Sequence, residues 1–236
     1  MRKIGIGSLT AAIVVMAVMT DAGRHAAAQT EKSPYPVMAP LDQYLMPEAD
    51  EIALARSAAP KGVSDAAEVM VLRKDGYATA VKGTNGFMCI VERAWANETT
   101  AADFWNPKMR APNCYNAAGA KTFENIYLMK TRWVLEGKSP KEIAKAIASA
   151  RETKQLPELA PGAMAYMMSK QQYLNDGAKA WHPQTMFLTA GDTAKSWGAD
   201  QPGSPIMSGY DPEERVTILF VIADKWSDGT PGPPML

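Results

Sequence analysis

Cysteine and histidine are scarce in this chain, which has two of each among 236 residues. One histidine, His25, lies in an N-terminal segment that we expect to be removed, so His182 is the only histidine of the expected mature chain. Zinc and copper sites of ordinary composition need several cysteine or histidine ligands, and this chain has too few of them to build such a site. The alternating acidic residues of a calcium loop are also missing, even in the acidic stretch 211–215. We therefore predict no metal site.

Local catalytic signatures are missing too. The expected mature chain has no nucleophile elbow of the form GxSxG, no SxxK motif, no phosphate loop and no dinucleotide fingerprint. Serine hydrolase and nucleotide chemistry thus have no local signature, although the residues of a catalytic triad need not be neighbours in sequence. We predict no cofactor.

An excess of charge of one sign is absent as well. Residues 1–28 hold three of the 25 basic and one of the 25 acidic residues, which leaves 22 basic and 24 acidic residues and a net charge of −2. A chain this close to neutral produces no general field that would attract nucleic acid or an anionic membrane surface. We predict neither as a partner.

Long hydrophobic runs are also lacking. The apolar stretch Ile4–Met19 has about 16 residues, short of the roughly 20 that a membrane-spanning helix needs. Arg2 and Lys3 precede it and Ala26-Ala27-Ala28 follows, which is the pattern of a signal peptide at 1–28 with cleavage after Ala28. We expect a soluble product exported to the periplasm or the extracellular space, without a membrane span. The alternative is an uncleaved anchor.

Alternating and helical periods predict an α+β fold. We expect an extended arm at 29–46, one domain at 47–228 and a flexible tail at 229–236. Strands are predicted at 68–74, 77–82, 87–95, 163–169, 185–189 and 216–223, and helices at 47–59, 123–136 and 139–150. The turn dipeptides Asp75-Gly76 and Asn85-Gly86 indicate tight hairpins, so the first three strands should be antiparallel. The segment 96–116 resembles a loop pinned onto the core. The prediction is a mostly antiparallel sheet of five to seven strands, with the helical pair and the N-terminal helix on one face.

The two cysteines, Cys89 and Cys114, both belong to the expected mature chain. In an oxidising compartment they should form a disulfide. The bond would close a loop of about 26 residues and stabilise the fold by roughly 3.5 kcal/mol in the chain-entropy model. The alternative is a Cys-His nucleophile with His182, which the apolar neighbours of Cys89 disfavour because they would raise the pKa of its thiol. Alternation in the third strand groups Phe87, Cys89, Val91 and Trp95 on one face.

Polar side chains flanked by aromatic ones supply the candidate site. The candidates for proton transfer are His182, Glu92 and Asp103, and the candidates for binding are Trp105, Asn106, Tyr166, Lys170, Trp181 and Arg93. Structural alternatives remain open: Glu92 and Arg93 can form a paired charge at a strand end, and Trp181-His182-Pro183 can be a turn packed on the core.

Four segments, GTNGFMCIVERAW, FWNPKMRAPNCYN, PGAMAYMMSKQQYLND and WHPQTMF, together resemble a family of uncharacterised exported bacterial proteins. The resemblance covers the chain from about Leu41 to Asp228. It implies a bacterial envelope or extracellular location and a single domain, and it brings no activity or catalytic residue with it. Our leading hypothesis is an exported protein that binds a small molecule or an envelope component. The alternative is a secreted or periplasmic hydrolase that uses Glu92 and His182.

Overall fold

The computed structural model describes residues 33–234. The predicted signal peptide and residues 29–32 of the predicted arm lie outside the described residues. The helices are η1 (Leu41–Gln43), α1 (Glu48–Arg56), α2 (Lys61–Ser64), η2 (Ala94–Ala96), α3 (Ala117–Thr122), α4 (Glu124–Leu135), α5 (Pro140–Glu152) and η3 (Ala194–Trp197). The strands are β1 (Glu68–Arg73), β2 (Gly76–Val81), β3 (Met88–Glu92), β4 (Ala111–Tyr115), β5 (Met164–Met167), β6 (Gln184–Ala190), β7 (Ile206–Asp211) and β8 (Val216–Ile222).

The fold is α+β, as predicted, and the strands form one mixed sheet in the order β2-β1-β3-β4-β5-β6-β8-β7. All neighbouring pairs are antiparallel except β1 and β3, which are parallel. The sheet has eight strands, more than the five to seven predicted. The two extra strands are β4, which lies within the predicted loop 96–116, and β7, for which no strand was predicted.

The second predicted hairpin does not form. Asp75-Gly76 joins β1 to β2 as expected, but the chain after β2 crosses the start of β1 and pairs β3 with the other edge of that strand. The crossing takes place at Gly83, where a Cβ atom would lie 2.1 Å from the backbone nitrogen of Glu68. Only glycine allows so close a backbone approach, and the result is a parallel β1–β3 pair.

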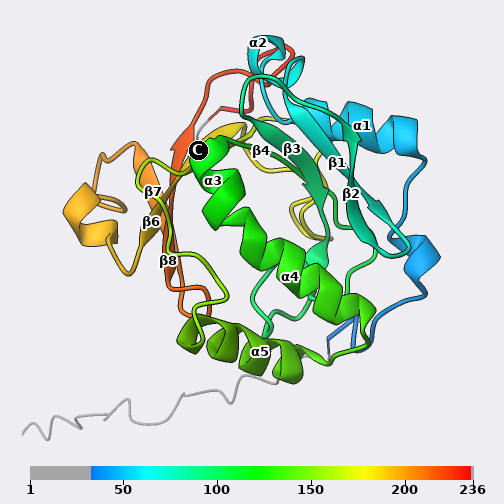
Figure 1. Ribbon diagram of the computed structural model, residues 1–236. Coiled ribbons are helices and arrows are strands. Elements are labelled where there is room, and N and C mark those ends of the chain that lie inside the picture. Colours follow the sequence, from blue (N-terminus) through cyan, green and yellow to red (C-terminus); the bar gives the residue numbers. More distant parts are fainter. Residues whose placement is uncertain (1–32, 235–236) are drawn as a thin grey trace, which may run out of the picture. The chain divides into compact units, whose positions relative to one another are not determined.

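Helices cover both faces of the sheet, so the prediction that all of them pack on one face is wrong. Helix α1 packs on one face, where Leu54 and Ala55 join the apolar cluster of β1, β3 and β4. Helices α4 and α5 pack on the opposite face, where Ile126 and Ile143 belong to the larger apolar cluster. Figure 1 shows α4 running across that face, with α1 on the far side of the strands. Strand β3 is buried on both sides for this reason.

Alternation in β3 is confirmed within the strand and fails beyond it. Cys89 and Val91 face α1, whereas Met88 and Ile90 face α4 and α5. Trp95, predicted on the side of Cys89, belongs to the opposite cluster. The strand ends at Glu92, and η2 then follows with a helical twist, so the period of two no longer applies.

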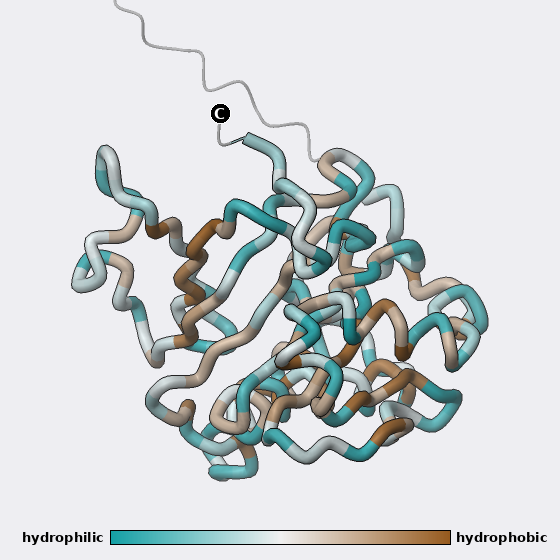
Figure 2. The backbone as a smooth tube through the Cα atoms, turned by 90° about the horizontal axis from the view of Figure 1, so that it is seen from above, coloured by the Kyte–Doolittle hydropathy of each residue, from teal (hydrophilic) through white to brown (hydrophobic). Residues whose placement is uncertain are grey.

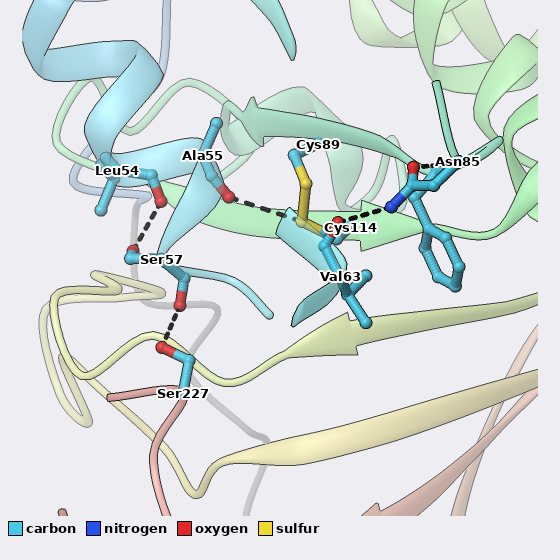
Figure 3. The surroundings of a disulfide bond; sticks show 9 residues. Leu54, Ala55, Ser57, Val63, Asn85, Cys89, Cys114 and Ser227 are labelled. Carbon is cyan, nitrogen blue, oxygen red and sulfur yellow. Dashed lines mark hydrogen bonds between the residues drawn. A yellow bond between two sulfur atoms is a disulfide. The ribbon is translucent and has the colours of Figure 1, made fainter. Parts of the chain in front are cut away.

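Cys89 and Cys114 form a disulfide. They are directly opposite residues of β3 and β4, and both side chains are fully buried. Cys114 is therefore a strand residue, whereas the sequence predicted that it lies in a loop. Figure 3 shows the bond beside α1, with the Cys114 sulfur 3.6 Å from the carbonyl oxygen of Ala55. Neither sulfur is a free thiol, so this state offers no Cys-His nucleophile.

The three predicted helices begin one residue later in the structure, at Glu48, Glu124 and Pro140, and α1 ends at Arg56, before the predicted end at residue 59. Pro47 precedes α1, and three acidic residues occupy its first turn, where they face the positive end of the helix dipole. Ser139 and Glu142 form the expected capping box of α5. Across residues 33–234, no helix is long and apolar enough to cross a membrane. In Figure 2 the hydrophobic stretches of the backbone are short and alternate with hydrophilic ones.

The ends of the described chain pack against the domain. Tyr44 is fully buried and donates a hydrogen bond of 2.8 Å to the carbonyl oxygen of Trp105. Near the other end, Lys225 and Pro231 form an isolated β-bridge, and the Gly232 amide donates to the carbonyl of Asp224. Residues of the predicted arm thus pack on the core, and residues of the predicted tail pair with the segment that follows β8.

Candidate functional site

A cavity of about 670 Å³ lies on the face of the sheet that carries α4. Strands β3 to β8 contribute to its wall, together with the start of α4 and the segment that joins β3 to β4. The lining residues are Glu92, Ala96, Asn97, Glu98, Ala101, Asp103, Met109, Ala111, Asn113, Tyr115, Phe123, Tyr127, Met167, Leu174, Asn175, Trp181, Gln184, Met186, Leu188, Gly209, Tyr210, Asp211, Glu214, Ile218 and Phe220. We refer to it as the central cavity.

Strand geometry explains which side chains reach the central cavity. Every second residue of a strand points to the same face. In β6 these residues are Gln184, Met186 and Leu188, and in β8 they are Ile218 and Phe220. Met186 lies directly opposite Phe220, and Leu188 lies opposite Ile218. The register of two neighbouring strands thereby builds a continuous apolar wall.

Glu92 is the acidic residue at the end of β3, and its side chain turns into the central cavity. Its Oε1 accepts a hydrogen bond of 2.6 Å from the Tyr115 hydroxyl, and its Oε2 accepts one of 2.9 Å from Asn113 Nδ2. Only 7% of its surface is exposed. Burial raises the pKa of Glu92 to about 7, although the two hydrogen bonds favour the ionised form. The carboxyl is therefore poised to gain or lose a proton near neutral pH.

A second carboxyl, that of Glu124 at the start of α4, lies against Glu92. The two carboxyls are within hydrogen-bonding reach of each other, and Glu124 is fully buried. Burial raises the pKa of Glu124 well above its usual value, and the negative charge of Glu92 raises it further. Neither oxygen of Glu124 has a hydrogen-bond donor among the described residues. Two buried carboxyls this close favour a shared proton, because two negative charges at this distance would repel each other.

A third carboxyl, that of Glu214, lines the cavity and is neutralised differently. It forms a buried ion pair with Lys130 of α4, in which Nζ lies 3.1 Å from Oε1. Lys130 Nζ also donates to the carbonyl oxygen of Asn97 at 2.9 Å. Burial raises the pKa of Glu214, and the positive charge of Lys130 opposes that rise. Lys130 itself is fully buried and does not line the cavity.

Two buried amides complete the polar part of the site. Asn113 and Gln184 both line the central cavity and are each 2% exposed. Asn113 Oδ1 and Gln184 Oε1 have no hydrogen-bond partner among the described residues. Buried polar atoms are nearly always paired in folded proteins, so these two acceptors are suited to a bound donor.

The structure brings together three of the predicted site residues. Glu92, Asp103 and Trp181 all line the central cavity. Asp103 lies in the segment between η2 and β4, where its Oδ1 accepts a hydrogen bond of 3.1 Å from Asn97. The Trp181 ring packs edge-on against Phe220, with 5.7 Å between ring centroids.

Arg93 follows Glu92 in sequence but points elsewhere. It forms an ion pair with Glu51 of α1, with Nη2 2.8 Å from Oε1, and both side chains are fully buried. Arg93 Nε also donates to the carbonyl oxygen of Tyr44 at 2.8 Å, and the backbone amide of Leu72 donates to Glu51 at 3.1 Å. The structure thus places Arg93 in a buried pair and outside the lining of the central cavity.

The remaining predicted site residues do not line the central cavity. Trp105 and Asn106 are buried, and Trp105 packs edge-on against Phe104. The ring centroid of Tyr166 lies 6.2 Å from that of Phe87, beside the cluster that faces α1. Lys170 forms an exposed ion pair with Asp228 at 2.5 Å.

His182 is half-buried beside Trp181, and its ring packs edge-on against the indole with 5.7 Å between centroids. Its Nδ1 atom has no hydrogen-bond partner among the described residues. Glu92 lines the cavity and His182 does not, so the predicted pair does not share the cavity wall.

Sequence reasoning missed several residues of the site. Gln184 could have been found, because it continues the alternation of Met186 and Leu188. Asn113 and Tyr115 were hidden because their strand was assigned to a loop. Glu124 resembles an ordinary acidic residue in the first turn of a helix, and no local pattern indicates that it packs against Glu92.

Residues 33–234 contain no group of three or more histidine, cysteine or acidic side chains placed to hold a metal ion. Comparison with protein-family models, with curated proteins and with solved structures gives no match to this chain. The functional argument therefore depends on the geometry of the central cavity.

Proposed function

We propose that this protein is an exported binding protein that holds a small, largely apolar organic molecule in the central cavity. The observation that carries the proposal is the cavity itself, whose volume of about 670 Å³ falls in the range of small-molecule sites. Apolar surface makes up the larger part of the wall, and Asn113 and Tyr115 donate hydrogen bonds to the Glu92 carboxyl within it. A mainly apolar wall with placed polar groups is typical of ligand pockets.

A cavity-filling substitution tests the proposal. Ala111 lies opposite Glu92 in the β3–β4 pair and lines the cavity, so Ala111→Leu adds three carbon atoms to that wall. We expect the wild-type protein to bind the uncharged dye N-phenyl-1-naphthylamine with one saturable site and a rise in dye fluorescence. Ala111→Leu should weaken this binding by about tenfold or more. The larger side chain displaces part of the dye, and each carbon of the dye that is no longer buried costs about 0.8 kcal/mol of binding free energy.

The matched control is Phe187→Leu, since Phe187 lies in β6 but is exposed and does not line the cavity. Circular dichroism of all three proteins confirms that they fold alike. Equal dye binding by Ala111→Leu and wild type would place the dye elsewhere and contradict the proposal. Mass spectrometry of protein purified under native conditions then identifies any molecule that copurifies with wild type and is lost from Ala111→Leu.

Export is part of the proposal. Its support is the basic, apolar and small-residue pattern of residues 1–28 together with the buried Cys89–Cys114 disulfide. Fractionation of the producing cells should find a polypeptide that begins at Gln29 outside the cytoplasm. The intact chain with two reduced thiols in the cytoplasm would contradict this part.

A second candidate function is a hydrolase, and the observation that favours it is Glu92. A carboxyl whose pKa lies at about 7 is well matched to general acid or base catalysis. Asp103 lines the same cavity, whereas His182 does not. A screen of ester, amide and glycoside reporter substrates with wild type and Glu92→Gln distinguishes the two functions. Turnover that Glu92→Gln abolishes would favour the hydrolase, and binding without turnover favours the binding protein.

A further inference from the structure

We propose that the ligand of the central cavity is an organic ammonium ion, a protonated primary or secondary amine on an apolar or aromatic body, held by Glu92. This inference rests on the proposed binding function and adds the chemical class of the ligand. Three independent features of the wall support it: the sign of its charges, its unpaired acceptors and its aromatic rings.

The charges of the described lining residues have one sign. Five carboxyl groups line the central cavity, those of Glu92, Glu98, Asp103, Asp211 and Glu214, and the described lining includes no lysine, arginine or histidine. Lys130 neutralises Glu214 from outside the wall. The chain as a whole has equal numbers of basic and acidic residues, so the negative excess is local to this wall. A wall of this kind attracts a cation and repels an anion.

The unpaired polar atoms of the wall are acceptors. Asn113 Oδ1 and Gln184 Oε1 have no partner among the described residues. The orientation of the Asn113 amide follows from its contact with Glu92, to which Nδ2 donates, so Oδ1 is the free end. A carboxylate can also accept more hydrogen bonds than the two that Glu92 already receives. A primary ammonium group has three N–H donors and no acceptor, which matches a wall whose unpaired polar atoms are acceptors.

Aromatic rings form another part of the wall. The lining includes Tyr115, Phe123, Tyr127, Trp181, Tyr210 and Phe220. The faces of such rings attract a cation, most strongly when water is excluded. Met109, Met167 and Met186 also line the cavity and provide adaptable apolar surface for the body of the ligand. The wall thus matches both parts of an amphiphilic amine.

The test uses three probes of similar shape that differ in charge. 2-Phenylethylammonium is positive, 2-phenylethanol is neutral and phenylacetate is negative. The same three compounds with naphthyl in place of phenyl cover a larger body. Isothermal titration calorimetry at pH 8 measures their dissociation constants for the full-length mature protein, for Glu92→Gln and for Glu68→Gln. The second variant is the control, because Glu68 is a half-buried glutamate of β1 that does not line the cavity.

We expect the ammonium probe to bind at least about tenfold more tightly than the alcohol, which is the difference that a hydrogen bond to a buried charge supplies. The carboxylate probe should bind most weakly. Glu92→Gln should remove most of the preference for the ammonium probe over the alcohol, while Glu68→Gln retains that preference.

The outcomes separate this inference from the proposed function. Equal affinity for ammonium and alcohol would overturn the ammonium assignment and leave the binding function intact. An undiminished preference in Glu92→Gln would overturn the role of Glu92. Binding of the uncharged dye without any preference among the probes also rejects the ammonium assignment, whereas failure of the dye and of all six probes to bind rejects the binding function itself.

Discussion

Glu92→Gln should make the protein more stable at alkaline pH, and it should remove much of the loss of stability that we expect as the pH rises. The substitution keeps the shape of the side chain and removes its charge. In the folded protein the carboxyl is buried beside Glu124 and resists ionisation, whereas in the unfolded chain it ionises freely. The folded state therefore binds more protons than the unfolded state over part of the pH range, and its stability falls there as the pH increases.

The structure sets the magnitude and the pH window of this effect. The pKa of Glu92 rises from 4.5 in the unfolded chain to about 7 in the folded protein. Each unit of difference corresponds to about 1.4 kcal/mol, so ionising Glu92 costs about 3 kcal/mol of folding free energy. The cost is absent below pH 4.5, grows between pH 4.5 and pH 7, and is fully present above pH 7. Glu92→Gln should thus be stabilised by about 2–4 kcal/mol at pH 8 and nearly unchanged at pH 4.5.

Urea unfolding followed by tryptophan fluorescence, at pH values from 4.5 to 8, measures this difference. Glu98→Gln is the control, because its half-buried side chain lacks the hydrogen bonds and the carboxyl neighbour of Glu92, and its curve should parallel that of wild type. The reasoning is refuted if Glu92→Gln is less stable than wild type at pH 8, or if both proteins lose stability equally between pH 4.5 and pH 8. Either result would mean that the carboxyl is ionised without cost in the folded protein.

Three further results are expected. Replacing Cys89 and Cys114 together by alanine should lower the free energy of unfolding by about 3.5 kcal/mol under oxidising conditions, and urea unfolding with and without a reductant should show wild type, but not the variant, to be sensitive to reduction. Arg93→Met should cost about 3–5 kcal/mol because it leaves the Glu51 charge buried and unpaired, and the double variant with Glu51→Leu should recover part of that loss in the same assay. The affinity for an ammonium probe should fall as the pH drops below about 7, since Glu92 then takes up a proton, and calorimetry at pH 5.5 and pH 8 checks this.

The parts of the fold that could be predicted are those with a strong local pattern. The capping box at Ser139 and the apolar run of β8 identify their elements without reference to the rest of the chain. The Asn85-Gly86 dipeptide had the sequence of a hairpin turn, yet Gly83 allowed the chain to cross β1 before that turn. A local signal for a tight turn does not specify which strand becomes the partner, because strand pairing depends on distant contacts.

Strand β4 shows a different limit. Its sequence, APNCY, contains a proline and an asparagine, which strands usually avoid. The surrounding core overrides this preference, since all five residues are buried between β3 and β5. Asn113 and Tyr115 reach the cavity only because this segment is a strand, so the error in secondary structure also concealed part of the site.

The candidate site was predictable where a polar residue ends an apolar strand, as Glu92 does. Its partner Glu124 comes from a helix about thirty residues later in the chain, and only tertiary packing brings them together. Arg93 and Lys170 were plausible binding residues by type. Their ion partners, Glu51 and Asp228, are distant in sequence, and nothing near either residue indicates the pairing.

Glu92 and Arg93 are adjacent in the chain, yet Glu92 lines the central cavity whereas Arg93 pairs with Glu51 of α1. A ligand that shifts the Glu92 carboxyl also displaces the backbone of Arg93. Arg93 pairs with the Glu51 carboxylate, and that carboxylate accepts a hydrogen bond from the Leu72 amide. We therefore expect occupancy of the cavity to alter hydrogen exchange at the Leu72 amide, which lies outside the lining of the cavity.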